Sequence, residues 1–354
     1  MERAILTGLR SGGLELFSTC PQSKDPHSGS YRERVAEVAR WSERAGYRGI
    51  LVYTDNQLVD PWLVAQLVIE ATDQLCPLVA VQPIYMHPYT VAKIVSSIGH
   101  VYGRRIYLNM VAGGFRNDLL ALGDDTPHDE RYERAIEYAL IVKRLLAGSS
   151  VSFEGRFYRM KNVLLAPALP PELTPPVFVS GSSDAGMLAA RTIGATAVKY
   201  PKPPDEEAPV ADGATPIGIR VGVIAREDEA SAWDAAHTRF PDDRRGQVTH
   251  ALAMKTSDSQ WHRQLSQLGD AAPSSRNPYW LGPFENYKTF CPYLVGSYGR
   301  VADELERYLR LGFGTFILDI PASEEELEHT AIAFEHAVGR LGSEAGEAMR
   351  AGEA

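Results

Sequence analysis

The chain has 354 residues, of which 36 are Lys or Arg and 45 are Asp or Glu, so its formal net charge at neutral pH is −9. This charge argues against a broad nucleic-acid-binding surface, and no apolar run approaches the roughly 20 residues of a membrane span. The N-terminus lacks the apolar segment of a secretory signal. Three widely spaced cysteines outside any CxxC pattern argue against a disulfide scaffold or a zinc cluster. We therefore expect a globular, cytoplasmic enzyme.

The first 150 residues alternate between short apolar runs and amphipathic segments. Four strands are predicted, over Gly12–Thr19, Gly49–Thr54, Pro77–Pro83 and Arg105–Val111. Each is followed by a predicted helix, over Tyr31–Gly46, Asp60–Thr72, Thr90–Gly103 and Asp129–Gly148. In the second helix, Asp60 is the expected N-cap and Pro61 the first helical residue. Four such units in succession predict a parallel sheet with right-handed crossovers.

The alternation pauses at Val151–Leu165, where the pattern around Glu154-Gly155 predicts a β-hairpin outside the main sheet. It resumes with strands predicted at Pro176–Gly181, Ala195–Tyr200, Ile217–Ala225 and Gly314–Ile320, and a last helix over Glu324–Leu341. Eight strands favour a closed (β/α)8 TIM barrel over the alternative, an open doubly wound sheet. We expect one domain over residues 1–342, a lid insertion over the barrel mouth at about 240–296, and a disordered tail at 343–354.

The carboxyl ends of the predicted strands carry small hydrogen-bonding groups and few strong acids or bases. In a barrel of this kind the active site lies at those ends. They lack paired acid/base carboxylates, a His-x-His pair and a G-x-S-x-G elbow, which indicates a site that holds a cofactor with its own reactivity.

The segment VSGSSDAG, Val179–Gly186, is the sharpest local signal. A strand ends in Gly181, Ser182 and Ser183, and a helix begins at once. Free amides at the helix start, two hydroxyls and the positive end of the helix dipole suit a phosphate. An ordinary serine N-cap beside a turn glycine explains the same residues without a ligand.

A second signal lies in LNMVAGGF, Leu108–Phe115, and TPHDERYERAIEY, Thr126–Tyr138. Asn109 at a strand end can bind a cofactor amide, and His128 and Tyr132 flank the start of the next helix. The alternative is a flexible loop, an N-cap at Asp129 and a tyrosine packed on the barrel.

The ordered run LNMVAGG, HDERY, LLAG, FEGRFY and PPVFVSGSSDAG resembles the bacterial-luciferase-like flavin-dependent monooxygenases, most of all the alkanesulfonate monooxygenase branch. The resemblance covers most of the chain. It implies a TIM barrel that takes reduced FMN (FMNH2) from a separate NAD(P)H:FMN reductase and uses O2 as co-substrate. A flavin C4a-peroxide would transfer one oxygen atom to the substrate. It also suggests a homo-oligomer, a dimer or larger.

By position, the resemblance assigns cofactor contacts to eight residues. The flavin phosphate would be bound by Ser182 and Ser183 with Tyr132, next to Gly181. The remaining contacts would be His128 and Asn109, Met110 against the isoalloxazine ring, and Thr54 near the polar edge of that ring.

The substrate half of the site departs from the sulfonate branch. Leu58 replaces a cysteine, Gln82 replaces an arginine, and the Arg-x-His of strand 7 becomes Arg220-Val221-Gly222. A buried sulfonate needs fixed cations, and most are missing. Several aromatic residues expected at the mouth suit an apolar or amphipathic substrate instead, either free or bound to a carrier: Tyr53, Tyr85, Tyr200, Tyr279, Trp280, Phe284, Tyr287, Phe290 and Tyr293.

Two residues are candidates for catalysis. His87 could exchange a proton near neutral pH, or it could simply cap the helix that starts at Pro88. Arg220 could bind an anionic group of the substrate or flavin, or pair with a carboxylate of the barrel rim. Metal ligands are not expected.

Two other functions fit the same barrel. One is a deazaflavin (F420)-dependent oxidoreductase, which would use no oxygen. The other is a flavoprotein that binds FMN without turnover, made plausible by the missing groups of the sulfonate branch.

Overall fold

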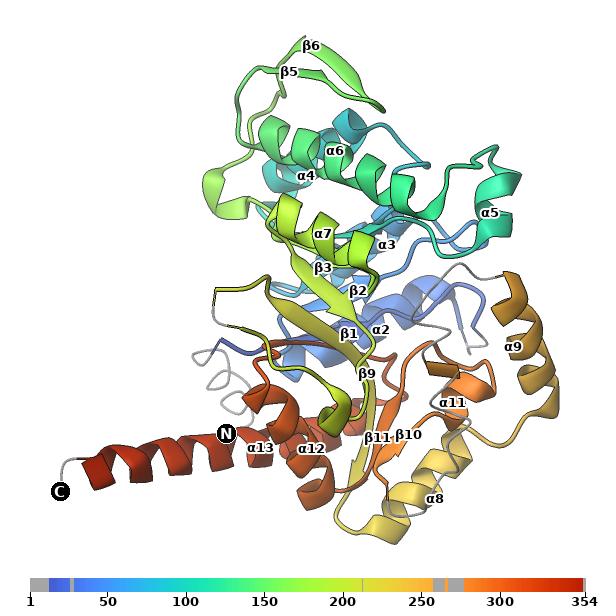
Figure 1. Cartoon of the computed structure of the whole chain (residues 1–354), viewed down its shortest axis with the longest axis vertical. Helices are drawn as coiled ribbons and strands as arrows, with labels where there is room; N and C mark the ends of the chain where they lie inside the picture. Colours follow the sequence, from blue (N-terminus) through green and yellow to red (C-terminus); the bar gives the residue numbers. More distant parts are fainter. Residues whose placement is uncertain (1–12, 26–28, 212, 257–264, 267–276, 353–354) are drawn as a thin grey trace.

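The computed structural model describes residues 13–25, 29–211, 213–256, 265–266 and 277–352 (Figure 1). Eight parallel strands form a ring in the order β1, β2, β3, β4, β7, β8, β9, β12. β12 pairs with β1, and β8 pairs with β9, so the ring has no open edge. The predicted TIM barrel is therefore confirmed, and the open sheet is wrong. The strands span Glu15–Thr19, Gly49–Val52, Cys76–Val81, Tyr107–Val111, Val177–Ser180, Thr196–Lys199, Ile217–Arg226 and Thr315–Leu318.

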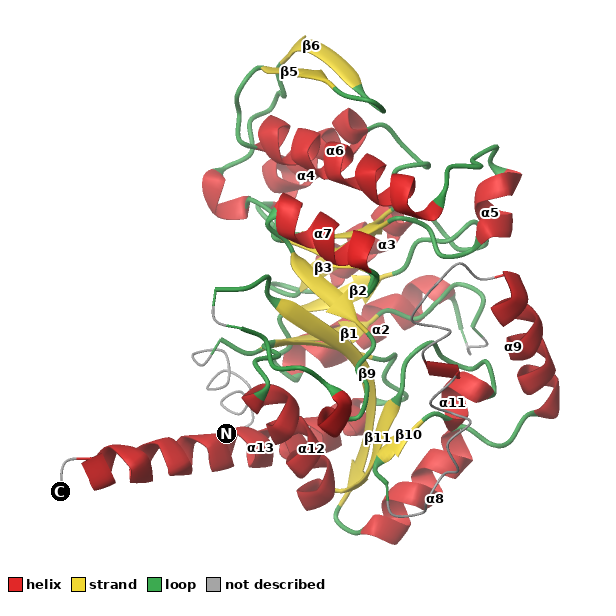
Figure 2. Cartoon of the chain, in the orientation of Figure 1, coloured by secondary structure: helices red, strands yellow, loops and turns green. Residues whose placement is uncertain are grey.

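Helices surround the ring (Figure 2). The longer ones are α2 (Tyr31–Arg44), α3 (Pro61–Ala71), α4 (Pro88–Tyr102), α6 (His128–Leu146), α7 (Asp184–Ile193), α8 (Glu229–Arg239), α12 (Tyr298–Arg310) and α13 (Glu324–Gly352). The expected start of α3 is confirmed, because the Asp60 carboxylate accepts a hydrogen bond from the Trp62 amide at 2.9 Å and Pro61 opens the helix. At the other end of a helix, Gly103 supplies the left-handed residue that ends α4.

Large side chains fill the inside of the barrel. Phe17 packs edge-on against Tyr107 and Phe178, with ring centroids 5.2 and 5.4 Å apart. The rest of this interior cluster consists of Leu51, Cys76, Leu78, Val198 and Ile317. Because these residues occupy the middle of the ring, the free space lies at the carboxyl ends of the strands.

The hairpin forms where the sequence predicts it. β5 (Val151–Glu154) and β6 (Arg159–Val163) pair antiparallel, outside the barrel sheet. The Glu137 carboxylate of α6 accepts hydrogen bonds from the amides of Arg156, Phe157 and Tyr158, which holds the turn against the helix.

The insertion contains two strands that the sequence analysis missed, β10 (Tyr279–Trp280) and β11 (Tyr293–Ser297). β9 is ten residues long, and its second half continues past the ring and pairs in parallel with β11. The 13-residue helix α9 (Arg244–Thr256) and the short helix α11 (Gly282–Glu285) lie in the same insertion, while the short helix α5 (Arg116–Ala121) follows β4. That the insertion acts as a lid stays a prediction.

The end of the chain differs from the expected tail. α13 continues as a helix to Gly352, through most of the segment 343–354. This segment contains Ala, Glu, Met and Arg, which favour helix.

Candidate functional site

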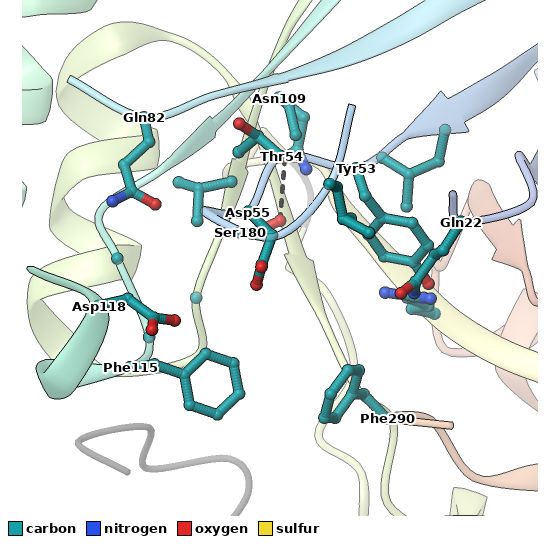
Figure 3. A pocket seen from close by; sticks show the side chains of 18 of the residues that line it. Gln22, Tyr53, Thr54, Asp55, Gln82, Asn109, Phe115, Asp118, Ser180 and Phe290 are labelled. Carbon is teal, nitrogen blue, oxygen red and sulfur yellow. Dashed lines mark hydrogen bonds between the residues drawn. The ribbon is translucent and has the colours of Figure 1, made fainter. Parts of the chain in front are cut away.

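A cavity of about 470 Å³ opens at the carboxyl ends of the barrel strands. Figure 3 shows part of its wall, with side chains from the loops after β1, β2, β3 and β4 and from the insertion. Of the ten residues that the sequence analysis proposed, five line it: Thr54, Asn109, Gly181, Ser182 and Arg220.

The end of β7 and the start of α7 form an anion cradle. Ser183 caps α7, and its hydroxyl accepts a hydrogen bond from the Gly186 amide at 3.2 Å. The Ser182 hydroxyl oxygen is buried and has no hydrogen-bond partner among the residues that the structure describes. An unpaired hydroxyl beside a helix N-terminus fits a phosphate oxygen. A cap and a phosphate contact are therefore compatible in this segment, because the cap uses Ser183 and leaves the Ser182 hydroxyl for a ligand.

Tyr132 of α6 closes the cradle from the outer side. Its hydroxyl donates to the Ser180 carbonyl oxygen at 3.3 Å. A Cβ atom on Gly181 would lie only 2.1 Å from this hydroxyl, so glycine is required for the approach. Burial raises the pKa of Tyr132, and a hydrogen bond with Ser183 opposes that shift. The phenol thus stays protonated and able to donate.

Asn109 and Met110 are neighbours on β4, but they point to opposite sides of the sheet. Asn109 lines the cavity, and its side-chain oxygen accepts a hydrogen bond from the Ser180 hydroxyl at 2.9 Å (Figure 3). Met110 is 1% exposed and belongs to the cluster between the barrel and its helices. Successive strand residues alternate between faces. Its side chain therefore does not fit the expected contact with a flavin ring.

The two histidines do not line the cavity. His128 begins α6, where its Nδ1 lies 2.7 Å from the Asp129 carboxylate and its ring packs against Tyr132. His128 contacts Tyr132, which is hydrogen-bonded to Ser180. His87 is the N-cap of α4: its Nδ1 accepts from the Tyr89 amide at 3.2 Å, and its ring packs against Tyr158. This geometry matches the capping interpretation of His87.

Arg220 lies on β9, two strands along the ring from β7; it lines the cavity and is 8% exposed. Its guanidinium lies 4.8 Å from the Tyr53 ring centroid and donates to the Tyr200 hydroxyl at 3.2 Å. Its Nη2 is 3.5 Å from the Asp319 carboxylate, although no hydrogen bond joins them. Both interpretations of Arg220 thus find support, because it lines the cavity and pairs with a carboxylate.

Asp319 is the counter-ion that the sequence analysis did not identify. It accepts hydrogen bonds from the hydroxyls of Thr289 at 2.5 Å and Tyr293 at 2.8 Å. Burial alone would raise the pKa of Asp319, but Arg220 and these hydrogen bonds outweigh burial and lower it. The carboxylate therefore stays ionised. Only the fold reveals the pair, since Arg220 is on β9 and Asp319 directly follows β12.

The mouth carries rings and two carboxylates. The Phe115 and Phe290 ring centroids lie 6.2 Å apart, with Asp55 and Asp118 above them in the view of Figure 3. Of the nine expected mouth aromatics, five line the cavity: Tyr53, Tyr85, Tyr200, Tyr287 and Phe290. The other four do not, and three of them are core residues: Tyr279, Phe284 and Tyr293. Phe115 and Asp118 were missed because they lie in a loop and a six-residue helix without a periodic pattern.

A second cavity of about 400 Å³ adjoins the first and shares Thr54, Asp55, Gln82 and Tyr85 with it. Its other walls include the apolar side chains of Trp62, Met86 and Leu122. Together the two cavities have room for more than one ligand.

Metal-ion sites and membrane-spanning helices are both absent from the described residues. No group of three or more His, Cys, Asp or Glu side chains there has the arrangement of a metal site. None of the helices there is both long and apolar enough to span a bilayer.

Comparison with known proteins places this geometry in context. A sequence model of the family described as luciferase-like monooxygenase matches residues 14–315. A relative from Niallia circulans, 4-(gamma-L-glutamylamino)butanoyl-[BtrI acyl-carrier protein] monooxygenase BtrO, is 34% identical over 307 residues, which cover 84% of this chain and 89% of the relative.

Two solved structures share the fold at low sequence identity. Riboflavin lyase RcaE, solved with modified FMN and riboflavin, aligns with a TM-score of 0.72 and 17% identity over 94% of this chain and 92% of its own. An F420-dependent secondary alcohol dehydrogenase aligns with a TM-score of 0.63 and 14% identity over 92% and 99%. At these identities the likeness concerns the fold alone.

Proposed function

The chain belongs to the luciferase-like monooxygenase family, and from this premise we propose that it is the oxygenase of a two-component system that hydroxylates an acyl group held on a carrier protein. The cofactor we propose is FMNH2, supplied by a separate NAD(P)H:FMN reductase. The overall reaction consumes FMNH2, O2 and the substrate C–H group, and it releases FMN, water and the hydroxylated product.

The anion cradle is the observation that carries the cofactor assignment. The unpaired Ser182 hydroxyl, the start of α7 and the close approach of Tyr132 over Gly181 fit a phosphate monoester. From there a flavin ring would extend towards Asn109 and Thr54, which offer an amide and a hydroxyl to its polar edge. Reduced flavin supplies the two electrons that oxygen transfer requires.

The remaining walls suit the substrate. Arg220 is held in place by Tyr200 and Asp319, so its orientation is fixed before the substrate arrives. We assign it to a carbonyl oxygen of the acyl group, which is neutral and does not compete with the Asp319 counter-ion. Phe115 and Phe290 would keep water from the reacting atoms.

The relative supports the substrate class, because its name describes a monooxygenase of a carrier-bound acyl group and it matches most of this chain. A simple alkanesulfonate stays disfavoured, since Arg220 already has a buried counter-ion in Asp319.

We further propose a cytoplasmic location, in keeping with three free, buried cysteines, and a homo-oligomeric state, a dimer or larger.

The test is an anaerobic titration with FMNH2 followed by isotopically labelled O2 and 4-(gamma-L-glutamylamino)butanoyl thioester. We expect one labelled oxygen atom in the product. Reduction of F420 by an alcohol, with no oxygen dependence, would support the dehydrogenase alternative, for which F420-dependent proteins of the same fold exist. Flavin binding without product from a panel of acyl thioesters would indicate a non-catalytic flavoprotein.

The cradle itself is tested by Ser182→Ala together with Ser183→Ala. Hydrogen bonds to a charged group contribute about 1.5–3 kcal/mol each, so we expect FMN affinity to fall about tenfold or more. Ser297→Ala is the matched control, because Ser297 caps α12 in the same manner as Ser183 caps α7 and does not line the cavity. Unchanged FMN affinity in the double variant, measured by titration calorimetry, would contradict the assignment.

A further inference from the structure

Four exposed cations lie on segments that contribute to the cavity wall. Lys24 is exposed and lines the cavity, Arg116 begins α5, and Arg244 and Arg245 begin α9; all four are exposed. Within the part of the chain that the structure describes, no ion pair involves any of the four. Several arginines elsewhere on the surface are paired with carboxylates instead, as Arg156 is with Glu133. These four positive charges lie near one cavity in a chain of net charge −9.

Apolar side chains are exposed on the same two helices. Val248 and Leu252 of α9 are 56% and 58% exposed, and Leu120 of α5 and Leu122 just after it are 45% and 47% exposed. Single exposed apolar residues are common, but four of them beside one cavity are a patch.

The helical spacing sorts α9 into two faces. Arg244, Val248 and Leu252 are four residues apart and form one stripe. The opposite side faces the protein: the His250 ring packs against Phe284 at 4.6 Å, and Ala253 lines the cavity. One helix therefore presents an arginine and two apolar side chains outward and forms part of the cavity wall with its other face.

α5 repeats this arrangement across the mouth. Arg116 and Leu120 are four residues apart and exposed, whereas Asn117 and Asp118 line the cavity. Figure 1 shows α5 and α9 on the same side of the molecule, above and below the gap at the ends of the strands. We name the two outward faces together the rim surface, which consists of Arg116, Leu120, Leu122, Arg244, Arg245, Val248 and Leu252.

Two carboxylates, Asp242 and Asp243, precede Arg244 in the sequence, and Asp242 is exposed. Asp243, next to Arg244, lies 2.5 Å from the Lys288 ammonium group and accepts a hydrogen bond from the Gly246 amide. Its charge is thus already compensated. Asp55 and Asp118 line the cavity below the rim.

We propose that the rim surface docks an acidic carrier protein, which delivers the acyl group on its phosphopantetheine arm into the cavity past Lys24. An apolar centre with unpaired cations complements an acidic protein surface, and such charges mainly raise the association rate. Lys24 is placed to meet the phosphate of the arm, because it is exposed and lines the cavity. This inference rests on the proposed function, since it assumes a carrier-bound substrate.

The experiment compares two forms of one substrate. The 4-(gamma-L-glutamylamino)butanoyl group is offered to the flavin-loaded enzyme on an acyl carrier protein and on free pantetheine. In the variant Arg244→Glu/Arg245→Glu, we expect the KM of the carrier-bound form to rise about tenfold or more. The reversed charges would repel the acidic carrier and slow its association. The KM of the pantetheine form and the FMN affinity should stay as in the wild type. Added salt should raise the carrier KM of the wild type only.

The matched control is Arg159→Glu/Lys161→Glu. These residues are exposed on β6, far from α9 in Figure 1, and the change in net charge is the same. We expect this variant to treat both substrate forms as the wild type does. If the KM of the carrier-bound form rises equally in both variants, the change in net charge alone would explain the rise, and the proposal would be overturned.

The other outcomes are equally decisive. Equal changes for both substrate forms, or no change for either, would mean that the rim surface does not dock the carrier. A change in the oligomeric state of the Arg244→Glu/Arg245→Glu variant, seen by sedimentation, would make this face an interface between copies of the chain. If the wild type turns over neither form, the proposed function fails. Docking is then read from the affinity of fluorescently labelled carrier protein, which supports the proposal only if the variant lowers it.

Discussion

At the scale of single residues, the side of a strand on which a side chain lies decides its role. Asn109 and Met110 are adjacent in the sequence and equally buried, yet only Asn109 lines the cavity. Met110 packs among the residues between the barrel and its helices. The same alternation places Arg220 of β9 at the cavity, while Val221 belongs to the core cluster.

Because the two side chains lie on different sides of the sheet, we expect Asn109 and Met110 substitutions to affect different properties. Asn109→Ala removes the acceptor of the Ser180 hydroxyl and a polar contact for the flavin, so we expect weaker FMN binding, by about tenfold. Met110→Leu conserves volume in the core and should cost less than about 1.5 kcal/mol of stability without changing FMN affinity. Titration of both purified variants with FMN is the measurement. A loss of affinity for Met110→Leu that matches that of Asn109→Ala would show that the methionine contacts the flavin.

At the scale of elements, residue types that occur in catalytic and binding sites also cap helices. Ser183 caps α7 while its neighbour Ser182 keeps an unpaired hydroxyl at the same turn. His87 caps α4 at the end of a loop that follows β3, with Pro88 as the first helical residue. In both places a residue type that also occurs in catalysis supplies the hydrogen bond that a helix N-terminus lacks.

The capping geometry of His87 makes a prediction that separates the two roles proposed for it. His87→Ala should lower the free energy of unfolding by about 1 kcal/mol, whereas His87→Asn should restore most of it, because Asn is a good N-cap. Both variants should keep the wild-type rate and pH profile of oxygen transfer. Urea denaturation and product formation are measured side by side. A rate that falls in both variants, with stability restored in His87→Asn, would assign His87 to catalysis.

At the scale of the whole molecule, the core contains phenols that the fold keeps neutral. Tyr47, Tyr138, Tyr293 and Tyr308 are among the largest fully buried side chains. Burial raises the pKa of each above the ordinary value of 10.0. Near the cavity, burial, Asp55 and Asp118 together raise the pKa of Tyr85 to about 12. The folded state therefore holds these protons more tightly than the unfolded chain does.

The sign of the pH effect follows from these shifts. The pKa values are raised in the folded state, so the associated stability is complete below pH 10 and is lost as the pH rises above it. Each such tyrosine weakens the fold by up to about 1.4 kcal/mol per pH unit in that range. We expect the unfolding midpoint in urea to fall steeply above about pH 10, with tyrosinate absorbance appearing together with unfolding. Absorbance that rises while the chain stays folded would contradict the buried, neutral phenols.

The sequence by itself determined the elements of the barrel. Buried parallel strands read as apolar runs, and each was followed by an amphipathic helix with recognisable caps, as at Asp60 and Gly103. The proposed anion cradle is equally local, because Gly181, Ser182 and Ser183 are consecutive at one strand-to-helix turn. Such features are encoded within a few residues, so they could be predicted without the fold.

The tertiary structure decided the features that depend on distant segments. β11 was missed because its partner is the extension of β9, and the Asp319 counter-ion of Arg220 lies 99 positions further along the chain. The rim surface likewise combines α5 and α9, which the closed ring of strands brings to the same side of the molecule. Which side of a helix or strand meets a cavity is set by packing, and packing energies depend on contacts that no local pattern encodes.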